Sequence, residues 1–143
     1  MKINLYNIAK FSILLLTACV DSIGNEISKQ DYAVSYKDSS QKASAECLLD
    51  YIVSEQLIQK KAQIIAKNDT VLVRLFGKPK GNWKKNEERK TAEFATKLLA
   101  NDFSKICFQQ KAVRLQIGQD FSKAENYLEA TSDGSVGFRD YKP

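Results

Sequence analysis

Apolar residues recur with helical spacing in two long stretches of the chain. The first begins at Ser39 or Ser40, either of which can cap a helix, and continues to about residue 67. Its apolar stripe consists of Ala45, Leu49, Ile52, Val53, Leu57 and Ile64. The second runs from Asn86, with acidic residues in its first turn, to Cys107. Its stripe consists of Phe94, Ala95, Leu98, Leu99, Phe103 and Ile106. Both stretches predict amphipathic helices.

Two other stretches have the composition and spacing of β-strands. Thr70–Phe76 is dense in β-branched and apolar residues and stops at Gly77, which predicts a central strand. Residues 113 to 117 alternate between apolar and polar side chains, which is typical of a strand with one exposed face.

Weaker signals flank these elements. Tyr32–Tyr36 alternates, which indicates either a strand or an extended lead-in. A short helix is expected within residues 121 to 128, and a last strand at residues 136 to 138. The sequence therefore predicts an α+β fold, in which a small sheet of about three to four strands packs with two long helices.

The first 18 residues combine positive charge with a short apolar run. Lys2 and Lys10 precede the mostly apolar residues 11 to 16, and this run is shorter than the roughly 20 residues that cross a bilayer. The segment ends in Leu16, Thr17, Ala18 and Cys19. These residues resemble the lipobox of bacterial lipoproteins, and the features before them fit a secretion signal.

The resemblance implies that Cys19 is lipidated and becomes the first residue of the mature protein. Residues 1–18 would then be the signal peptide, 19–38 the lipid anchor and tether, and 39–143 a single globular domain. In lipoproteins of the enteric type an aspartate after the cysteine retains the protein at the inner membrane. Val20 stands there, so the outer membrane is expected, with the domain on the periplasmic side. The alternatives are an ordinary secretory signal or a buried apolar helix.

Charge and length restrict the function further. The 143 residues carry a formal charge of +5, which falls to about +3 once Lys2 and Lys10 leave with the signal. This mild charge gives no support to a nucleic-acid partner, which an exported protein would not meet.

The remaining cysteines, Cys47 and Cys107, form one disulfide bond if the protein is exported, because the compartment is oxidising. The alternative is two buried free thiols. A bond would require the two helices to run antiparallel or to cross steeply near that corner.

Catalytic chemistry finds little support. The chain has no histidine, which excludes nucleophile–histidine pairs and removes the commonest zinc ligand. The carboxylate pairs Glu87/Glu88 and Asp120/Glu125 fall where helix starts and wet faces place acids, and no phosphate-binding glycine loop is present. We expect no enzyme activity, no cofactor and no metal.

A basic loop around the only tryptophan is the best candidate binding surface. Its residues are Lys78, Lys80, Trp83, Lys84, Lys85 and Arg89. Cations beside an exposed indole suit an acidic protein surface or anionic headgroups. Alternatively the loop is solvated and Trp83 folds back onto the core. In that case the binding surface is expected on the sheet, around Arg74, Arg114 and Gln116.

These features leave three functional hypotheses. The first is a non-enzymatic, protein-binding accessory or assembly lipoprotein, similar to a pilotin, with an envelope protein as partner. The second is a periplasmic immunity protein that neutralises a secreted toxin. A cell-envelope enzyme comes last because the chain lacks histidine.

Overall fold

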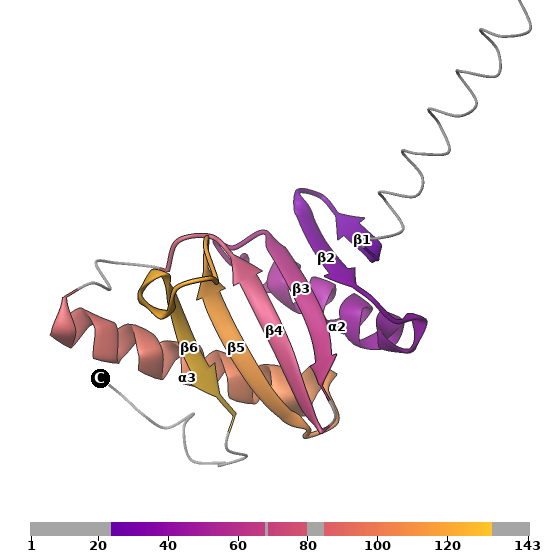
Figure 1. Ribbon diagram of the computed structural model, residues 1–143. Helices are drawn as coiled ribbons and strands as arrows, with labels where there is room; N and C mark the ends of the chain where they lie inside the picture. The colour runs from indigo at the N-terminus through magenta and orange to yellow at the C-terminus, as the bar shows by residue number, and fades with distance from the viewer. Residues whose placement is uncertain (1–23, 68, 80–84, 133–143) are drawn as a thin grey trace, which may run out of the picture.

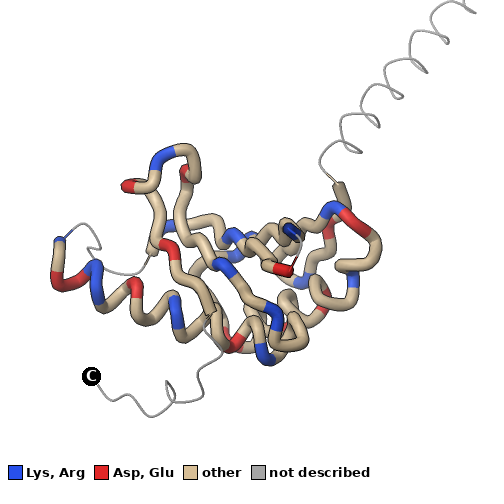
Figure 2. Tube along the Cα trace, turned by 60° about the horizontal axis from the view of Figure 1, so that its bottom comes forward, with Lys and Arg blue, Asp and Glu red and all other residues tan. Residues whose placement is uncertain are grey.

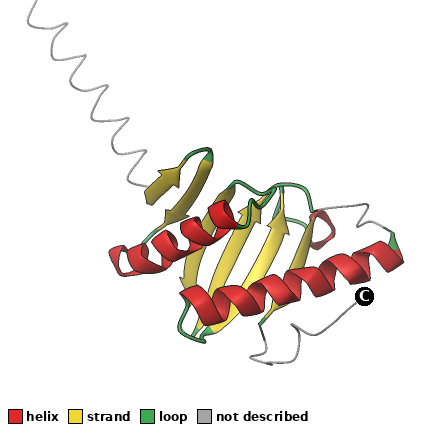
Figure 3. Cartoon of the chain, turned by 180° about the vertical axis from the view of Figure 1, so that it is seen from behind, coloured by secondary structure: helices red, strands yellow, loops and turns green. Residues whose placement is uncertain are grey.

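The computed structural model describes residues 24–67, 69–79 and 85–132. They form one sheet with two helices on one of its faces (Figures 1 and 3). The elements in chain order are β1 (Asn25–Lys29), β2 (Tyr32–Tyr36), the 3-10 turn η1 (Ser39–Gln41), α2 (Lys42–Ser54), β3 (Lys61–Lys67), β4 (Thr70–Phe76), α3 (Asn86–Cys107), β5 (Ala112–Gly118), the 3-10 turn η2 (Ala124–Asn126) and β6 (Tyr127–Thr131).

Within the described ranges the sheet has six strands, which lie side by side in chain order. Strands joined by short connections, β1–β2, β3–β4 and β5–β6, form antiparallel hairpins. Strands joined through a helix, β2–β3 and β4–β5, run parallel. The prediction of a small sheet of three to four strands is therefore wrong, because the structure has a mixed six-stranded sheet.

The first predicted helix is also too long, because it contains a helix and a strand. α2 ends at Ser54, and Gln56 then adopts a positive φ of 50°, which turns the chain out of the helix. The strand β3 follows, with Ala62 and Ile64 buried and Gln63 between them half-buried. Apolar residues at both odd and even positions of this segment fit a helical stripe as well as a strand, which explains the error.

The segment expected to be a tether contributes to the sheet. Asn25–Lys29 pairs with β2 across its full length, from Asn25 opposite Tyr36 to Lys29 opposite Tyr32. Only Ile27 of this strand is half-buried. A strand so poor in apolar residues carries no strong signal of its own, and its pairing with β2 places it in the folded domain.

Three predicted elements are confirmed, and the last part of the chain is corrected. The bounds of β4 and α3 are those expected, and β5 contains the predicted residues 113 to 117. The helix expected within residues 121 to 128 is replaced by the short turn η2 and the strand β6. The strand expected at residues 136 to 138 lies outside the described residues.

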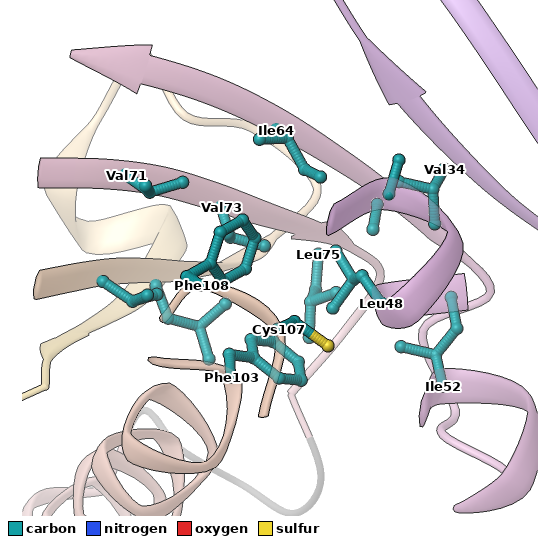
Figure 4. Close-up of a cluster of buried hydrophobic side chains, with 14 of the residues drawn as sticks. Val34, Leu48, Ile52, Ile64, Val71, Val73, Leu75, Phe103, Cys107 and Phe108 are labelled. Carbon is teal, nitrogen blue, oxygen red and sulfur yellow. The ribbon is translucent and has the colours of Figure 1, made fainter. Parts of the chain in front are cut away.

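The core lies between the sheet and the two helices. Alternate residues of the strands, among them Val34, Ile64, Val73 and Leu115, face the helices and are at most 1% exposed. They pack against the buried side of α2 and the C-terminal half of α3, where Phe103 is fully buried (Figure 4). Burial of one such large side chain contributes roughly 1.5–3 kcal/mol, so this layer supplies most of the stabilising free energy.

The topology contains two parallel crossovers of opposite hand. β2 and β3 run in one direction, and β4 and β5 run in the other. Both connecting helices cover the same face of the sheet, and both crossovers move toward the same edge of the sheet. Because only the strand direction differs between them, the two crossovers have opposite hands. One of them is therefore left-handed, against the usual right-handed rule.

The predicted disulfide bond is confirmed and ties the two helices together. Cys47 in α2 is bonded to Cys107 at the end of α3, and their Cα atoms are 5.5 Å apart. Nearby, Tyr51 donates a hydrogen bond of 3.2 Å to Asp102 Oδ2, and its ring packs edge-on against Phe103. The helices run in opposite directions (Figure 3), as expected, because the strands that precede them are antiparallel.

Candidate functional site

An apolar groove lies on the helical side of the sheet, between the segment that follows α2 and the first half of α3. It encloses about 660 Å³. Ile117 and Leu128 of the sheet line it, and both are buried. Leu57 and Ile58 line it from the segment after α2. A volume of this size lies within the range of protein pockets that bind ligands.

The first half of α3 contributes mostly small side chains to the wall of the groove. Ala92, Ala95, Thr96 and Leu99 line it from the helix. Thr96 is the only buried residue of α3 before Ala100. Small side chains leave space that the short helix α2, which packs mainly over β1 and β2, does not fill.

The predicted stripe of α3 is therefore only partly right. Phe103 is buried, but Ile106 is 51% exposed, and Phe94 and Leu98 are only half-buried. The helix is turned so that smaller and more polar residues face the sheet. They are Thr96, Ala100, Asn101, Ser104 and Cys107.

The mouth of the groove combines an exposed isoleucine with two acids. Ile58 is 64% exposed, the largest exposed fraction among the big apolar side chains of the described residues. Glu87 and Glu88, in the first turn of α3, also line the groove. Their carboxylates bring negative charge to an otherwise apolar site, which opposes the approach of an anionic ligand.

One end of the groove is fixed by contacts between the segment after α2 and the end of β4. The buried Gln59 donates a hydrogen bond of 2.9 Å from Nε2 to the carbonyl oxygen of Lys78. Gly77 lies beside this contact with a φ of +150°, which favours glycine, and a Cβ atom there would lie 3.2 Å from the Gln59 side chain. Pro79 then closes this end of the lining.

No family model, curated protein or solved structure matches this chain.

The opposite face of the sheet is turned toward the viewer in Figure 1, and no helix of the described residues covers it. It carries many polar side chains. The strand register aligns one row of polar side chains across five strands. The row consists of Ser35, Gln63, Arg74, Gln116 and Glu129. We call these five residues the polar row.

Hydrogen bonds connect one half of the polar row. Arg74 Nε donates to Gln116 Oε1 at 3.0 Å, and Gln116 Nε2 donates to Glu129 Oε2 at 2.6 Å. The same carboxylate oxygen accepts an ion-paired hydrogen bond of 2.9 Å from Arg114 Nε. Gln116 is only 5% exposed, so both ends of its amide are used inside the structure.

These contacts change the acidity of the charged groups. Burial raises the pKa of Glu129, but hydrogen bonds from Arg114 and Gln116 and the charge of Arg114 outweigh it, so its pKa lies below the usual value. The hydrogen bond to Glu129, together with its negative charge, raises the pKa of Arg114. Both groups are therefore ionised at neutral pH.

An aromatic corner lies beside the polar row. Phe76, Gly118 and Tyr127 are aligned across β4, β5 and β6. The ring of Phe121 packs against both Phe76 and Tyr127, with centroid distances of 5.3 and 5.6 Å. Glycine is required between them, because a Cβ atom at Gly118 would lie 2.6 Å from that of Tyr127.

The structure describes only part of the predicted basic loop. Lys80, Trp83 and Lys84 lie outside the described residues, as does Cys19. Lys78 and Lys85 are exposed. Arg89 forms an ion pair of 2.9 Å with Glu93 on its own helix, and charges of both signs alternate along α3 (Figure 2). Half of the residues of the basic loop lie outside the described ranges, so this binding surface stays a prediction.

Sequence reasoning named the sheet face around Arg74, Arg114 and Gln116 but missed the groove. The apolar spacing predicts one continuous helix that includes the wall residues Leu57 and Ile58, and such a helix leaves no signal for a cavity. Among the described residues, no cluster of three side chains able to hold a metal ion is present. In the same part of the chain, no helix has the length and apolar character needed to span a membrane.

Proposed function

We propose that this protein is a lipid-anchored outer-membrane lipoprotein, and that its domain binds an apolar segment of an envelope protein from the periplasmic side. It acts as a non-enzymatic accessory or assembly factor, as a pilotin does. The observation that carries the proposal is the apolar groove with Ile58 exposed at its mouth. Apolar contact area of this kind is the usual source of affinity in protein recognition.

The acids at the groove favour a protein segment over a lipid. A fatty acid or an anionic lipid would bring its own negative charge close to Glu87 and Glu88, which costs free energy. A segment of a protein chain can place an apolar side chain in the groove without a charge beside it.

The location rests on the N-terminal sequence and on the disulfide bond. The lipobox-like residues Leu16 to Cys19 supply the anchor, and more than one acyl chain makes such an anchor durable. The bond between Cys47 and Cys107 fits an oxidising compartment. Cys19→Ser should move the protein from the outer-membrane fraction to the soluble periplasmic fraction. A variant that stays fully membrane-bound would contradict the lipid anchor.

Two isoleucines provide a matched test of the groove. Ile58→Glu places a charge at the mouth of the groove, whereas Ile106→Glu makes the same change at an exposed position of α3 that does not line it. Each variant would carry a photo-crosslinking residue at position 95, inside the groove, and would be irradiated in intact cells. We expect the Ile58 variant to lose crosslinks to an apolar segment of its partner by about tenfold, and the Ile106 variant to keep them.

The identity of the crosslinked protein then decides the role. An envelope assembly component supports the accessory function, whereas a toxin encoded beside this gene would replace it with an immunity function. Equal crosslinking by the two variants would reject the groove as the binding site.

A further inference from the structure

Arg74 is the one charged residue in the otherwise apolar central strand β4, whose sequence is TVLVRLF. The strand lies between β3 and β5, so its side chains are surrounded by those of both neighbours. Arg74 is half-buried on the open face. A charged group in such a position costs free energy of desolvation unless it is paired.

The guanidinium of Arg74 is held in place without an ion pair. Gln116 accepts its Nε hydrogen bond, and the ring of Phe121 lies 4.9 Å from its Cζ atom. The one acid of the polar row, Glu129, is engaged by Gln116 and Arg114. Among the described residues, no carboxylate lies within ion-pairing distance of Arg74.

Most N–H donors of the Arg74 guanidinium are available to bind an anion. An arginine side chain has five N–H donors in a rigid fork, and Nε accounts for one of them. Described residues form no other hydrogen bond with Arg74. Because Gln116 and Phe121 fix the side chain, little conformational entropy is lost when the remaining donors bind an anion.

The surroundings of Arg74 indicate what kind of anion fits. The strand register places four basic residues on the open face, and two acidic ones, Glu26 and Glu129. The basic ones are Lys61, Lys67, Arg74 and Arg114. Phe76, two residues after Arg74 on the same face, is 38% exposed. Positive charge therefore lies next to an exposed aromatic ring.

We propose that the open sheet face around Arg74 binds an extended, acidic protein segment. A carboxylate of the segment accepts hydrogen bonds from the guanidinium of Arg74, and an apolar side chain two residues away packs against Phe76. Residues two apart on a strand are roughly 7 Å apart on one face, which matches the separation of these two partners. This site lies on the opposite side of the sheet from the groove and does not depend on it.

Fluorescence anisotropy with labelled peptides tests the proposal on the folded protein with its disulfide intact. The probe is a short peptide that contains Leu-Ser-Asp between serine and glycine residues, and its counterpart contains Asn in place of Asp. At about 20 mM salt, where charges are weakly screened, we expect the Asp peptide to bind about tenfold more tightly. Arg74→Gln should abolish this difference, so that both peptides bind equally weakly.

Two further variants separate recognition from net charge. Lys42→Gln removes one positive charge from α2, on the helical side of the sheet, where Lys42 is exposed, and should change binding of the Asp peptide by less than about twofold. Arg74→Lys keeps the charge but loses the fork, and should fall between wild type and Arg74→Gln. Ile58→Glu should leave the peptide affinities unchanged, which separates this site from the groove.

Equal weakening by Arg74→Gln and Lys42→Gln would overturn the proposal, because only the total charge would matter. Equal affinity of wild type for the Asp and Asn peptides would overturn it as well. If Arg74→Gln loses its cooperative thermal melt, it cannot be used to test binding, and Arg74→Lys replaces it. If Arg74→Lys then binds the Asp peptide as tightly as wild type does, the forked guanidinium has no role in recognition.

Discussion

The two sides of the sheet are built by opposite means. On the helical side, the groove is bounded by apolar side chains and small residues, and its shape follows from how α2 and α3 cover the sheet. On the open side, the polar row is fixed by strand register and by hydrogen bonds between Arg74, Gln116 and Glu129. Burial of apolar area is non-directional, whereas charged hydrogen bonds depend on geometry, pH and salt.

This difference shows how one small domain can offer two separate surfaces. The groove depends on the relative position of two helices, so changes that loosen the helices alter it. The polar row depends on the register of β2 to β6, which the core on the other side of the sheet maintains. Variants that affect one surface without the other therefore test this distinction.

The largest effect is expected from removal of the disulfide bond. The double variant Cys47→Ala and Cys107→Ala should lower the free energy of unfolding by about 4 kcal/mol, because the bond closes a loop across a sequence separation of 60 residues. Urea denaturation measures this change. The bond joins α2 to α3, so amide exchange should rise first in the helices and only later in β4 to β6.

Reduction of the wild-type protein provides the control for this prediction and should give a similar loss of stability. If the double variant loses protection from amide exchange equally in helices and strands, the disulfide bond does not stabilise the helical side in particular.

A smaller effect is expected from Glu129 on the open face. Glu129→Gln should destabilise the domain by about 1 kcal/mol at neutral pH, because it removes a partly exposed ion pair with Arg114. The folded-state pKa of Glu129 is lowered, so its stabilisation is present above its ordinary pKa near 4.5. It is lost as the pH falls through the folded-state pKa.

The difference between wild type and Glu129→Gln should therefore be seen in urea midpoints at about pH 7 and should shrink at about pH 3. Glu26→Gln is the matched control, since Glu26 lies on the same face and forms no ion pair with a described residue. Its effect should stay within about 0.5 kcal/mol. A pH-independent difference for Glu129→Gln would show that the loss does not come from ionisation.

The smallest effect is expected from an isolated surface pair. Asp31 lies 3.5 Å from Lys60, and its side chain is 81% exposed. Asp31→Asn should change the free energy of unfolding by less than about 0.5 kcal/mol, and added salt should remove even that. Thermal melts at low and high salt would check this. If Asp31→Asn lowers the free energy of unfolding as much as Glu129→Gln does, the hydrogen-bond network around Glu129 stabilises the domain no more than one isolated surface ion pair.

The elements predicted well from the sequence are those whose signals are local and strong. β4 has a continuous β-branched and apolar sequence, and α3 has acidic residues in its first turn and apolar spacing over its whole length. The disulfide pairing followed from the cysteine count and the expected export. None of these inferences required knowledge of which segments meet in space.

The errors occurred where local signals were ambiguous. Lys61–Lys67 fits both a helical stripe and a strand, and only the turn at Gln56, a residue that rarely takes a positive φ, separates it from α2. Asn25–Lys29 is mostly polar and became a strand because β2 offers it hydrogen bonds along its length. Each strand is defined by the strand with which it pairs, and that partner is either distant in the sequence or has only a weak strand signal. Periodicity alone could therefore identify neither strand.

The sequence by itself determined the long helix α3, the strands β4 and β5, and the presence of a charge at position 74 in a mostly apolar strand. The tertiary structure decided the six-strand order, the opposite hands of the two crossovers, the groove beside α3 and the alignment of Arg74 with Gln116 and Glu129. The reason is physical: propensity and amphipathic spacing act over a few residues, whereas register, cavities and side-chain networks arise only when distant segments compete for the same neighbours.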